Sequence, residues 1–279
     1  MSKITLLLPD LHHRVDHADK IIKHVGADEV IFLGDAFDDF DDTPEMVKHT
    51  CEWVENFINT PNHIFIGGNH DIQYMYPYKS FQCSGYAQWK YFIVRDTINP
   101  KLWDKVKWYY FLDDVWLLSH AGLHNLNVPE EIAKVRKDRP KFINELSQYL
   151  DAEIRKGFNY GASGAGSWIF NAGRARWGQQ RVGGITWCDF NQEFFPVRGI
   201  NQIMGHTPQM QGARWCIWEK DPQKSGGRVA YRPHDLWKPT VKGLDDPNLS
   251  SNICLDVHGN THWATWDGKE LKIGNYRDL

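Results

Sequence analysis

The stretch EVIFLGDAFD, residues 29–38, decides the fold class of this sequence. An apolar run ends there at a glycine and is followed at once by carboxylates. Residues 4–8 form a second run of this kind, followed by Pro9 and Asp10. Continuous apolar runs of this length are typical of strands that are buried on both faces of a parallel sheet. Ligand sites of open α/β sheets collect at the carboxyl ends of such strands.

Helical patterns alternate with the predicted strands, which indicates an α/β fold. Helices are predicted over residues 16–25, 44–59 and 129–156. The run Asp42-Thr43-Pro44-Glu45 supplies an N-cap and a first-turn proline for the second. Further strands are predicted at residues 63–66, 115–118, 202–204, 253–257, 262–266 and 271–273. Asp267-Gly268 indicates a hairpin between the last two. Residues 157–184 have no clear periodicity, and we expect an inserted loop region there.

Composition excludes several classes of protein. The chain has 279 residues, 42% of them hydrophobic, and a net charge of −3 from 32 Lys and Arg against 35 Asp and Glu. These values exclude a disordered chain and argue against a surface built throughout for nucleic acid. Five cysteines without a CxxC pair argue against a disulfide framework and favour a cytoplasmic location. The amino-terminal apolar run is too short for a signal peptide or a membrane span, so we expect no membrane partner.

Potential metal ligands follow five of the predicted strands. A single Asp-x-His is common in solvated turns, but five such pieces in order are difficult to obtain by chance. The pieces are Asp10-Leu-His12, Gly34-Asp35-Ala-Phe-Asp38, Gly68-Asn69-His70-Asp71, His120 and Gly205-His206.

This series resembles the motifs of the calcineurin-like metallophosphoesterases, which run DxH, GDxxD, GNH[ED], H and GHx. The forms GNHD, HAG and GHTP are most similar to the bacterial and phage branch of phosphoprotein phosphatases and diadenosine tetraphosphatases. The resemblance implies a four-layer α/β/β/α sandwich that forms a single domain over residues 1–279. It also implies two divalent metal ions at the strand ends.

The resemblance implies two ligand sets that share one bridging carboxylate. The sets are Asp10, His12 and Asp35 for the first ion, and Asp35, Asn69, His120 and His206 for the second. Two such ions bind phosphoryl oxygens and lower the pKa of a water to make a nucleophile near neutral pH. We expect manganese, with iron, zinc, nickel or magnesium as alternatives, because ligand identity alone does not choose between them.

The resemblance assigns the proton transfer to His70. This histidine would protonate the leaving oxygen, and Asp38 would orient its ring. An alternative for Asp38 is a helix-capping aspartate within the acidic run 38–42. Asp71 either supports the site or caps the next turn, and the sequence does not choose.

The phosphate-binding arginines of protein phosphatases are absent, because their positions hold Asp39 and Gly67. Arg198 is the leading substitute, and Arg14 is a second. Arg174, Arg176 and Arg181 are further candidates. Many nucleases of the superfamily carry a last metal-binding histidine where this chain has Pro208, which favours monoester or anhydride chemistry.

The remaining histidines are interpreted mainly as background. His13 is expected to support the site or the fold, and His124 is more easily explained as a loop residue than as a substrate contact. Seven others are predicted not to bind metal: His17, His24, His49, His63, His234, His258 and His262.

The leading hypothesis is a two-metal phosphoesterase that hydrolyses phosphomonoesters, with a phosphoprotein or a small phosphorylated molecule as substrate. The alternative is a nucleotide or nucleic-acid phosphodiesterase that cleaves a dinucleoside polyphosphate, a cyclic nucleotide or RNA ends, with residues 157–184 gripping the base. Nucleic acid is the less favoured partner. A catalytically silent binding module is a third interpretation, and retention of every metal motif argues against it.

Overall fold

Two β-sheets form the centre of this computed structural model, which describes residues 3–164, 167–210, 212–219, 228–233, 248–257 and 262–279. The first sheet has the strand order β11-β10-β1-β2-β3. Its strands are β1 (Thr5–Leu8), β2 (Glu29–Phe32), β3 (His63–Phe65), β10 (His262–Trp266) and β11 (Leu271–Asn275). The strands β1, β2 and β3 are parallel, and β10 joins β1 in antiparallel orientation. The expected parallel centre of this sheet is therefore confirmed.

The second sheet has the order β4-β5-β6-β9-β7-β8. Its strands are β4 (Tyr110–Leu112), β5 (Trp116–Leu118), β6 (Asn201–Met204), β7 (Arg214–Glu219), β8 (Arg228–Pro233) and β9 (Ser250–Cys254). Here β5, β6 and β9 are parallel, and the outer pairs are antiparallel. Both sheets thus have parallel strands whose carboxyl ends can meet at one edge.

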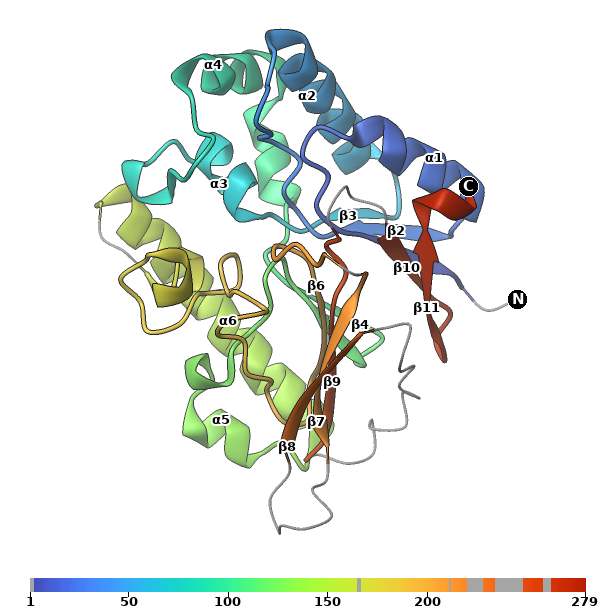
Figure 1. Ribbon diagram of the computed structural model, residues 1–279. Coiled ribbons are helices and arrows are strands. Elements are labelled where there is room, and N and C mark those ends of the chain that lie inside the picture. The colour runs from blue at the N-terminus through green and yellow to red at the C-terminus, as the bar shows by residue number, and fades with distance from the viewer. Residues whose placement is uncertain (1–2, 165–166, 211, 220–227, 234–247, 258–261) are drawn as a thin grey trace.

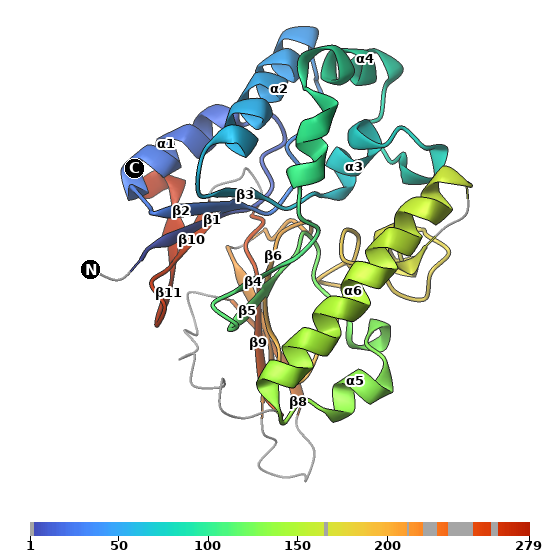
Figure 2. The ribbon, with the colours of Figure 1, turned by 180° about the vertical axis from the view of Figure 1, so that it is seen from behind.

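Helices cover the outer faces of the two sheets, as Figures 1 and 2 show from opposite sides. The first sheet is covered by α1 (Val15–Val25) and α2 (Pro44–Asn59), with α3 (Asn69–Met75) and α4 (Gln88–Thr97) beside them. The second sheet is covered by α5 (Glu130–Lys134) and α6 (Arg139–Ala162). The four-layer α/β/β/α sandwich is confirmed.

Alternating side chains of the central strands fill two layers of core. Leu6 and Leu8 belong to the cluster beneath the helices, together with Val15 of α1. Leu7 points the other way and joins the cluster between the sheets, which includes Trp116 of β5. Because both faces of β1 are covered, its sequence is a continuous apolar run rather than an alternating one.

The helix predicted over residues 129–156 is wrong in its bounds. Two helices occupy this region, and Asp138 caps the second by accepting a hydrogen bond from Lys141 N at 3.3 Å. Pro140 explains the break, because a proline lacks the N–H needed inside a helix and is tolerated in a first turn. Since α6 continues to Ala162, the first six residues of the predicted loop 157–184 are helical.

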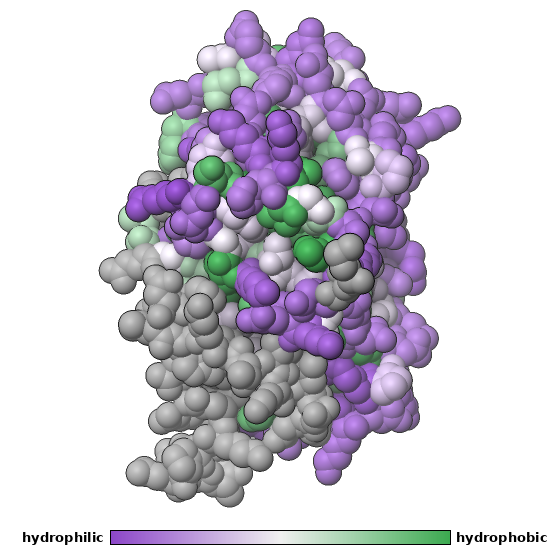
Figure 3. Space-filling model, turned by 90° about the vertical axis from the view of Figure 1, so that its right-hand side faces the viewer, coloured by the Kyte–Doolittle hydropathy of each residue, from purple (hydrophilic) through white to green (hydrophobic). Residues whose placement is uncertain are grey.

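The helices and one face of the surface can be compared with what a membrane span would require. None of the helices within the described residues is both long and apolar enough to span a bilayer. Figure 3 shows a face on which the described side chains are mainly hydrophilic, with hydrophobic ones in small separate areas. The five cysteines are all free thiols.

Candidate metal centre

The predicted ligands converge where the carboxyl ends of both sheets meet. Around Nε2 of His120, three other donor atoms lie within hydrogen-bonding distance. They are Asn69 Oδ1 at 3.1 Å, His206 Nδ1 at 3.2 Å and Asp35 Oδ2 at 3.2 Å. The second predicted ligand set is therefore brought together by β2, β3, β5 and β6.

The first predicted ligand set lies beside it and shares one member. Donor atoms of Asp10, His12 and Asp35 all lie within 4.8 Å of one another, and so do those of Asp35, His120 and His206. The His12 Nε2 atom is 4.0 Å from Asp35 Oδ2. Asp35 is thus positioned to bridge two cations.

The backbone orients two of the imidazole rings for metal binding. His120 Nδ1 lies 2.8 Å from the carbonyl oxygen of Leu33, and His12 Nδ1 lies 2.6 Å from that of Asp38. A carbonyl oxygen only accepts hydrogen bonds, so both Nδ1 atoms must carry the hydrogen. Each Nε2 atom then faces the centre and can bind a metal once it has released its own hydrogen, which is the usual arrangement of metal-binding histidines.

This donor set fits two divalent cations. The nitrogens of His120 and His206 face each other at 3.2 Å, a separation that requires a proton or a cation between their lone pairs. Carboxylate oxygen, amide oxygen and imidazole nitrogen together suit first-row divalent metals. The residues present therefore match the cofactor that the motifs imply.

Buried carboxylates give the centre a strong demand for positive charge. Burial raises the pKa of Asp10, and it raises the pKa of Asp256 well above its ordinary value. Burial acts on Asp35 in the same direction, but the nearby imidazoles, above all His120, hold its pKa well below its usual range. Negative charge that water cannot reach is stabilised by cations at the site.

Asp71 joins the two loops that carry Asp35 and Asn69. Its Oδ2 accepts hydrogen bonds from Asp35 N at 2.7 Å and Gly68 N at 2.8 Å, and its Oδ1 accepts one from Ala36 N at 2.9 Å. The side chain is fully buried. Asp71 therefore supports the site and the α3 turn together, and these were the two roles that the sequence left open.

The loops approach so closely that two positions require glycine. A Cβ atom on Gly68 would overlap Asp35 Oδ1, and one on Gly205 would overlap Asp10 Oδ1. The carboxylates lie against bare backbone at both places. This contact explains the glycine that precedes Asn69 and the glycine that precedes His206.

His70 and Asp38 form the expected pair. His70 Nδ1 lies 2.9 Å from Asp38 Oδ2, and the Asp38 side chain is buried. Burial lowers the pKa of His70, but neighbouring Cys83 and the two aspartates raise it well above its ordinary value. These contacts favour the protonated form of the ring.

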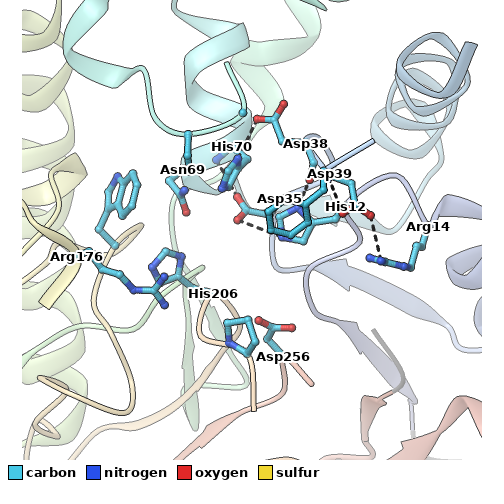
Figure 4. A pocket seen from close by; sticks show the side chains of 15 residues that line it. His12, Arg14, Asp35, Asp38, Asp39, Asn69, His70, Arg176, His206 and Asp256 are labelled. Atoms are coloured by element: carbon cyan, nitrogen blue, oxygen red, sulfur yellow. Dashed lines mark hydrogen bonds and ion pairs between the residues drawn. The ribbon is translucent and has the colours of Figure 1, made fainter. Parts of the chain in front are cut away.

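A cavity of about 450 Å³ opens over these residues. Figure 4 shows Arg176 and Arg14 on opposite sides of the cluster of ligands. Arg176 Nε donates to Asp189 Oδ2 at 2.7 Å, and Arg14 Nη2 lies 3.1 Å from Asp39 Oδ2. The cavity therefore combines the candidate metal ligands with two guanidinium groups in its walls.

A family profile described as calcineurin-like phosphoesterase matches residues 5–210, which contain all six predicted metal ligands. The chain belongs to the calcineurin-like phosphoesterase family. This phosphoesterase is a hydrolase that acts on phosphate esters, and its family depends on a dinuclear metal centre. A search of curated proteins by sequence found no match.

A comparison with solved structures found distantly similar chains. A candidate diadenosine tetraphosphatase is 12% identical with a TM-score of 0.45, and the match covers 99% of this chain and 94% of the other. A protein serine/threonine phosphatase from Saccharomyces cerevisiae, similar to human PP5, has the same identity and score, with 98% and 79% covered. A metallophosphoesterase from Sphaerobacter thermophilus is 13% identical with a score of 0.45, with 99% and 88% covered.

The structure does not bring Arg198 to the cavity of the phosphoesterase. Arg198 precedes β6, whereas His206 follows it, so a strand of about 13 Å separates the two ends. Its neighbour is Arg136, which together with burial lowers its pKa. Arg198 therefore lies near the amino end of β6, whereas the cavity lies at the carboxyl end of this strand. Arg176 from the 157–184 region lines the cavity instead.

Asp256 and Trp187 are among the cavity residues that were not singled out from the sequence. Asp256 follows β9 and lines the cavity, but the predicted strand 253–257 ran over it. Trp187 also lines the cavity, and its ring centroid lies 5.6 Å from that of His206. A carboxylate after an apolar strand was the available indication for Asp256. Nothing local to the sequence marked Trp187.

The other histidines lie away from the metal ligands or support them. His13 Nδ1 lies 2.7 Å from Thr50 Oγ1, behind the site. His124 Nδ1 accepts a hydrogen bond from Leu126 N at 3.0 Å and is buried, which lowers its pKa to about 4. His234 and His258 are outside the described residues.

Replacing Asp71 with asparagine should lower the free energy of unfolding. An amide offers one acceptor oxygen where the carboxylate serves three backbone N–H groups, so at least one buried donor loses its partner. The expected cost is about 1–3 kcal/mol, measured by urea denaturation of metal-free protein. The matched control is Asp278→Asn at an exposed position. Equal stability of the two variants would contradict the joining role of Asp71.

Proposed function

We propose that this phosphoesterase hydrolyses phosphomonoesters with two divalent ions, of which manganese is the expected metal. The proposal rests chiefly on the convergence of both ligand sets on Asp35 beside the pair of His70 and Asp38. Two bound cations would bind phosphoryl oxygens and make a water available as nucleophile near neutral pH. The residues Asp10, His12, Asp35, Asn69, His120 and His206 would hold them.

The chain's own residues complete the reaction. Asp38 accepts the hydrogen of His70 Nδ1, which leaves Nε2 to carry the proton needed by the leaving oxygen. Arg176 is held by Asp189 at the cavity wall, so its remaining N–H groups are available to the phosphate. A monoester carries more negative charge than a diester, and a guanidinium favours it for that reason.

Metal removal and a pair of reporter esters test the proposal. Chelator-treated protein should not hydrolyse p-nitrophenyl phosphate, and it should recover activity with Mn²⁺ at two ions per chain by elemental analysis. Iron, zinc, nickel and magnesium are tested in parallel. Hydrolysis of bis(p-nitrophenyl) phosphate should be slower. Faster hydrolysis of the bis-ester would overturn the assignment to monoesters.

Replacing Arg176 with alanine should raise KM for p-nitrophenyl phosphate about tenfold or more. A hydrogen bond to a charged group contributes about 1.5–3 kcal/mol, and each 1.4 kcal/mol corresponds to about a factor of ten. Arg174→Ala is the matched control, because Arg174 lies in the same short helical turn but is exposed and outside the cavity lining. Equal KM values for Arg176→Ala and Arg174→Ala would contradict a role of Arg176 in phosphate binding.

A second cavity supports a nucleotide as the alternative substrate. It also has a volume of about 450 Å³, and it shares Ser84, Arg176 and Trp187 with the first. Phe40 lines the first cavity and Trp177 lines the second, with relative exposures of 101% and 93%. These are the two most exposed large hydrophobic side chains in the described part of the chain. Exposed aromatic rings beside a phosphate site can stack on a base.

Replacing Trp177 with alanine distinguishes the two substrates. If a base stacks there, kcat/KM for diadenosine tetraphosphate should fall about tenfold, since stacking contributes about 1–3 kcal/mol per base. Hydrolysis of p-nitrophenyl phosphate should stay the same. The control is Tyr160→Ala, an exposed aromatic on α6 that lines neither cavity. An equal effect of Trp177→Ala on both substrates would argue against the nucleotide.

A further inference from the structure

A buried lysine lies behind the pair of Asp38 and His70. Lys90 is in the first turn of α4, a helix outside every motif of the sequence, and it is 6% exposed. Its Nζ donates to Asp38 Oδ1 at 2.8 Å, to Gly85 O at 2.8 Å and to Asp42 Oδ2. An ammonium group has three hydrogens, so these partners use all of its donors. Lys90 is absent from the cavity lining and therefore does not reach substrate.

The hydrogen bonds of Asp38 divide between its two oxygens. Oδ1 accepts from Lys90 Nζ and from Tyr74 OH at 2.6 Å. Oδ2 accepts from Gln73 Nε2 and from His70 Nδ1. Because Lys90 and Tyr74 hold Oδ1 in place, the carboxylate cannot rotate freely. Its Oδ2 atom therefore stays directed at the imidazole of His70. Asp38 also has a φ of 67°, a left-handed backbone that is costly for a non-glycine residue, so the side-chain bonds help to hold it.

Charge explains why the residue is a lysine. The side chains of Asp38 and Asp42 are both buried, and two neighbouring carboxylates without a cation repel each other in a medium of low dielectric constant. Burial lowers the pKa of Lys90, but its bonds to the two aspartates raise it above the ordinary value, so it stays charged. Buried ion pairs often add little to the free energy of unfolding. We therefore interpret this one as a contact that fixes the orientation of the Asp38 carboxylate.

We propose that Lys90 is a positioning residue of the phosphoesterase, which acts through Asp38 to hold His70 in the orientation that protonates the leaving group. The inference rests on the proposed role of His70. Protonation matters most when the leaving group is a strong base. Loss of positioning should therefore slow a substrate with a poor leaving group more than one with a good leaving group.

The experiment compares phenyl phosphate with p-nitrophenyl phosphate in the metal-loaded full chain. Lys90→Met should reduce kcat for phenyl phosphate about tenfold or more, within the range of general acid catalysis. It should reduce kcat for p-nitrophenyl phosphate much less and leave KM and metal content unchanged. Asp42→Asn is the matched control, because it removes the other ion pair of Lys90 and keeps the bond to Asp38.

The double variant Lys90→Met, Asp42→Asn keeps the buried charges balanced if the single variant does not fold. It should show the same preference for p-nitrophenyl phosphate. His70→Asn serves as the reference, and adding Lys90→Met to it should cause no further loss on phenyl phosphate, because residues that act through one group are not additive.

The outcomes separate the two claims. If His70→Asn itself slows both esters equally, His70 is not the general acid and the proposed mechanism fails together with the inference. If His70→Asn discriminates between the esters and the lysine variants do not, the role of Lys90 alone is overturned. Equal loss on both esters in the lysine variants marks a purely structural residue and also overturns it.

Discussion

The contacts of Asp35 are the interactions on which the rest of the site depends. Its carboxylate contributes to both ligand sets, its backbone N–H is held by Asp71, and its Oδ1 lies against Gly68. The residue has a φ of 60°, which reverses the chain directly after β2 and costs about 1–2 kcal/mol. Strain of this kind persists where the surroundings determine it, as they do here.

The two sheets together bring carboxylates and imidazoles to one buried site. Asp10 and Asp35 come from the first sheet, and His120, His206 and Asp256 come from the second. Each sheet alone would present its ligands to water at an open edge. Packed face to face, the sheets bury the carboxylates beside imidazoles, and the resulting excess of lone pairs favours cations. The same burial links metal affinity to correct packing of the sheets.

A second polar cluster supports the first from behind. It consists of Lys90, Asp38, Asp42 and Tyr74, which come from α4, from the loop after β2 and from α3. Its charges are nearly balanced without metal, in contrast to the metal centre. The candidate metal centre and this second cluster are therefore separate groups of buried charges. His70 lies between them, because its ring contacts Asp38 and its backbone N–H contacts Asp35.

The sequence by itself pointed to the residues that gather at the candidate metal centre, because each follows a predicted strand and its motif is visible within three or four residues. It also determined the layers of the fold, since strands that are covered on both faces appear as unbroken apolar runs. Only the tertiary structure decided that Arg176 and not Arg198 lines the cavity, and that Lys90 lies beside the motif residues. These positions depend on contacts between segments far apart in the chain, where loops and helix packing set the distance and no local pattern records it.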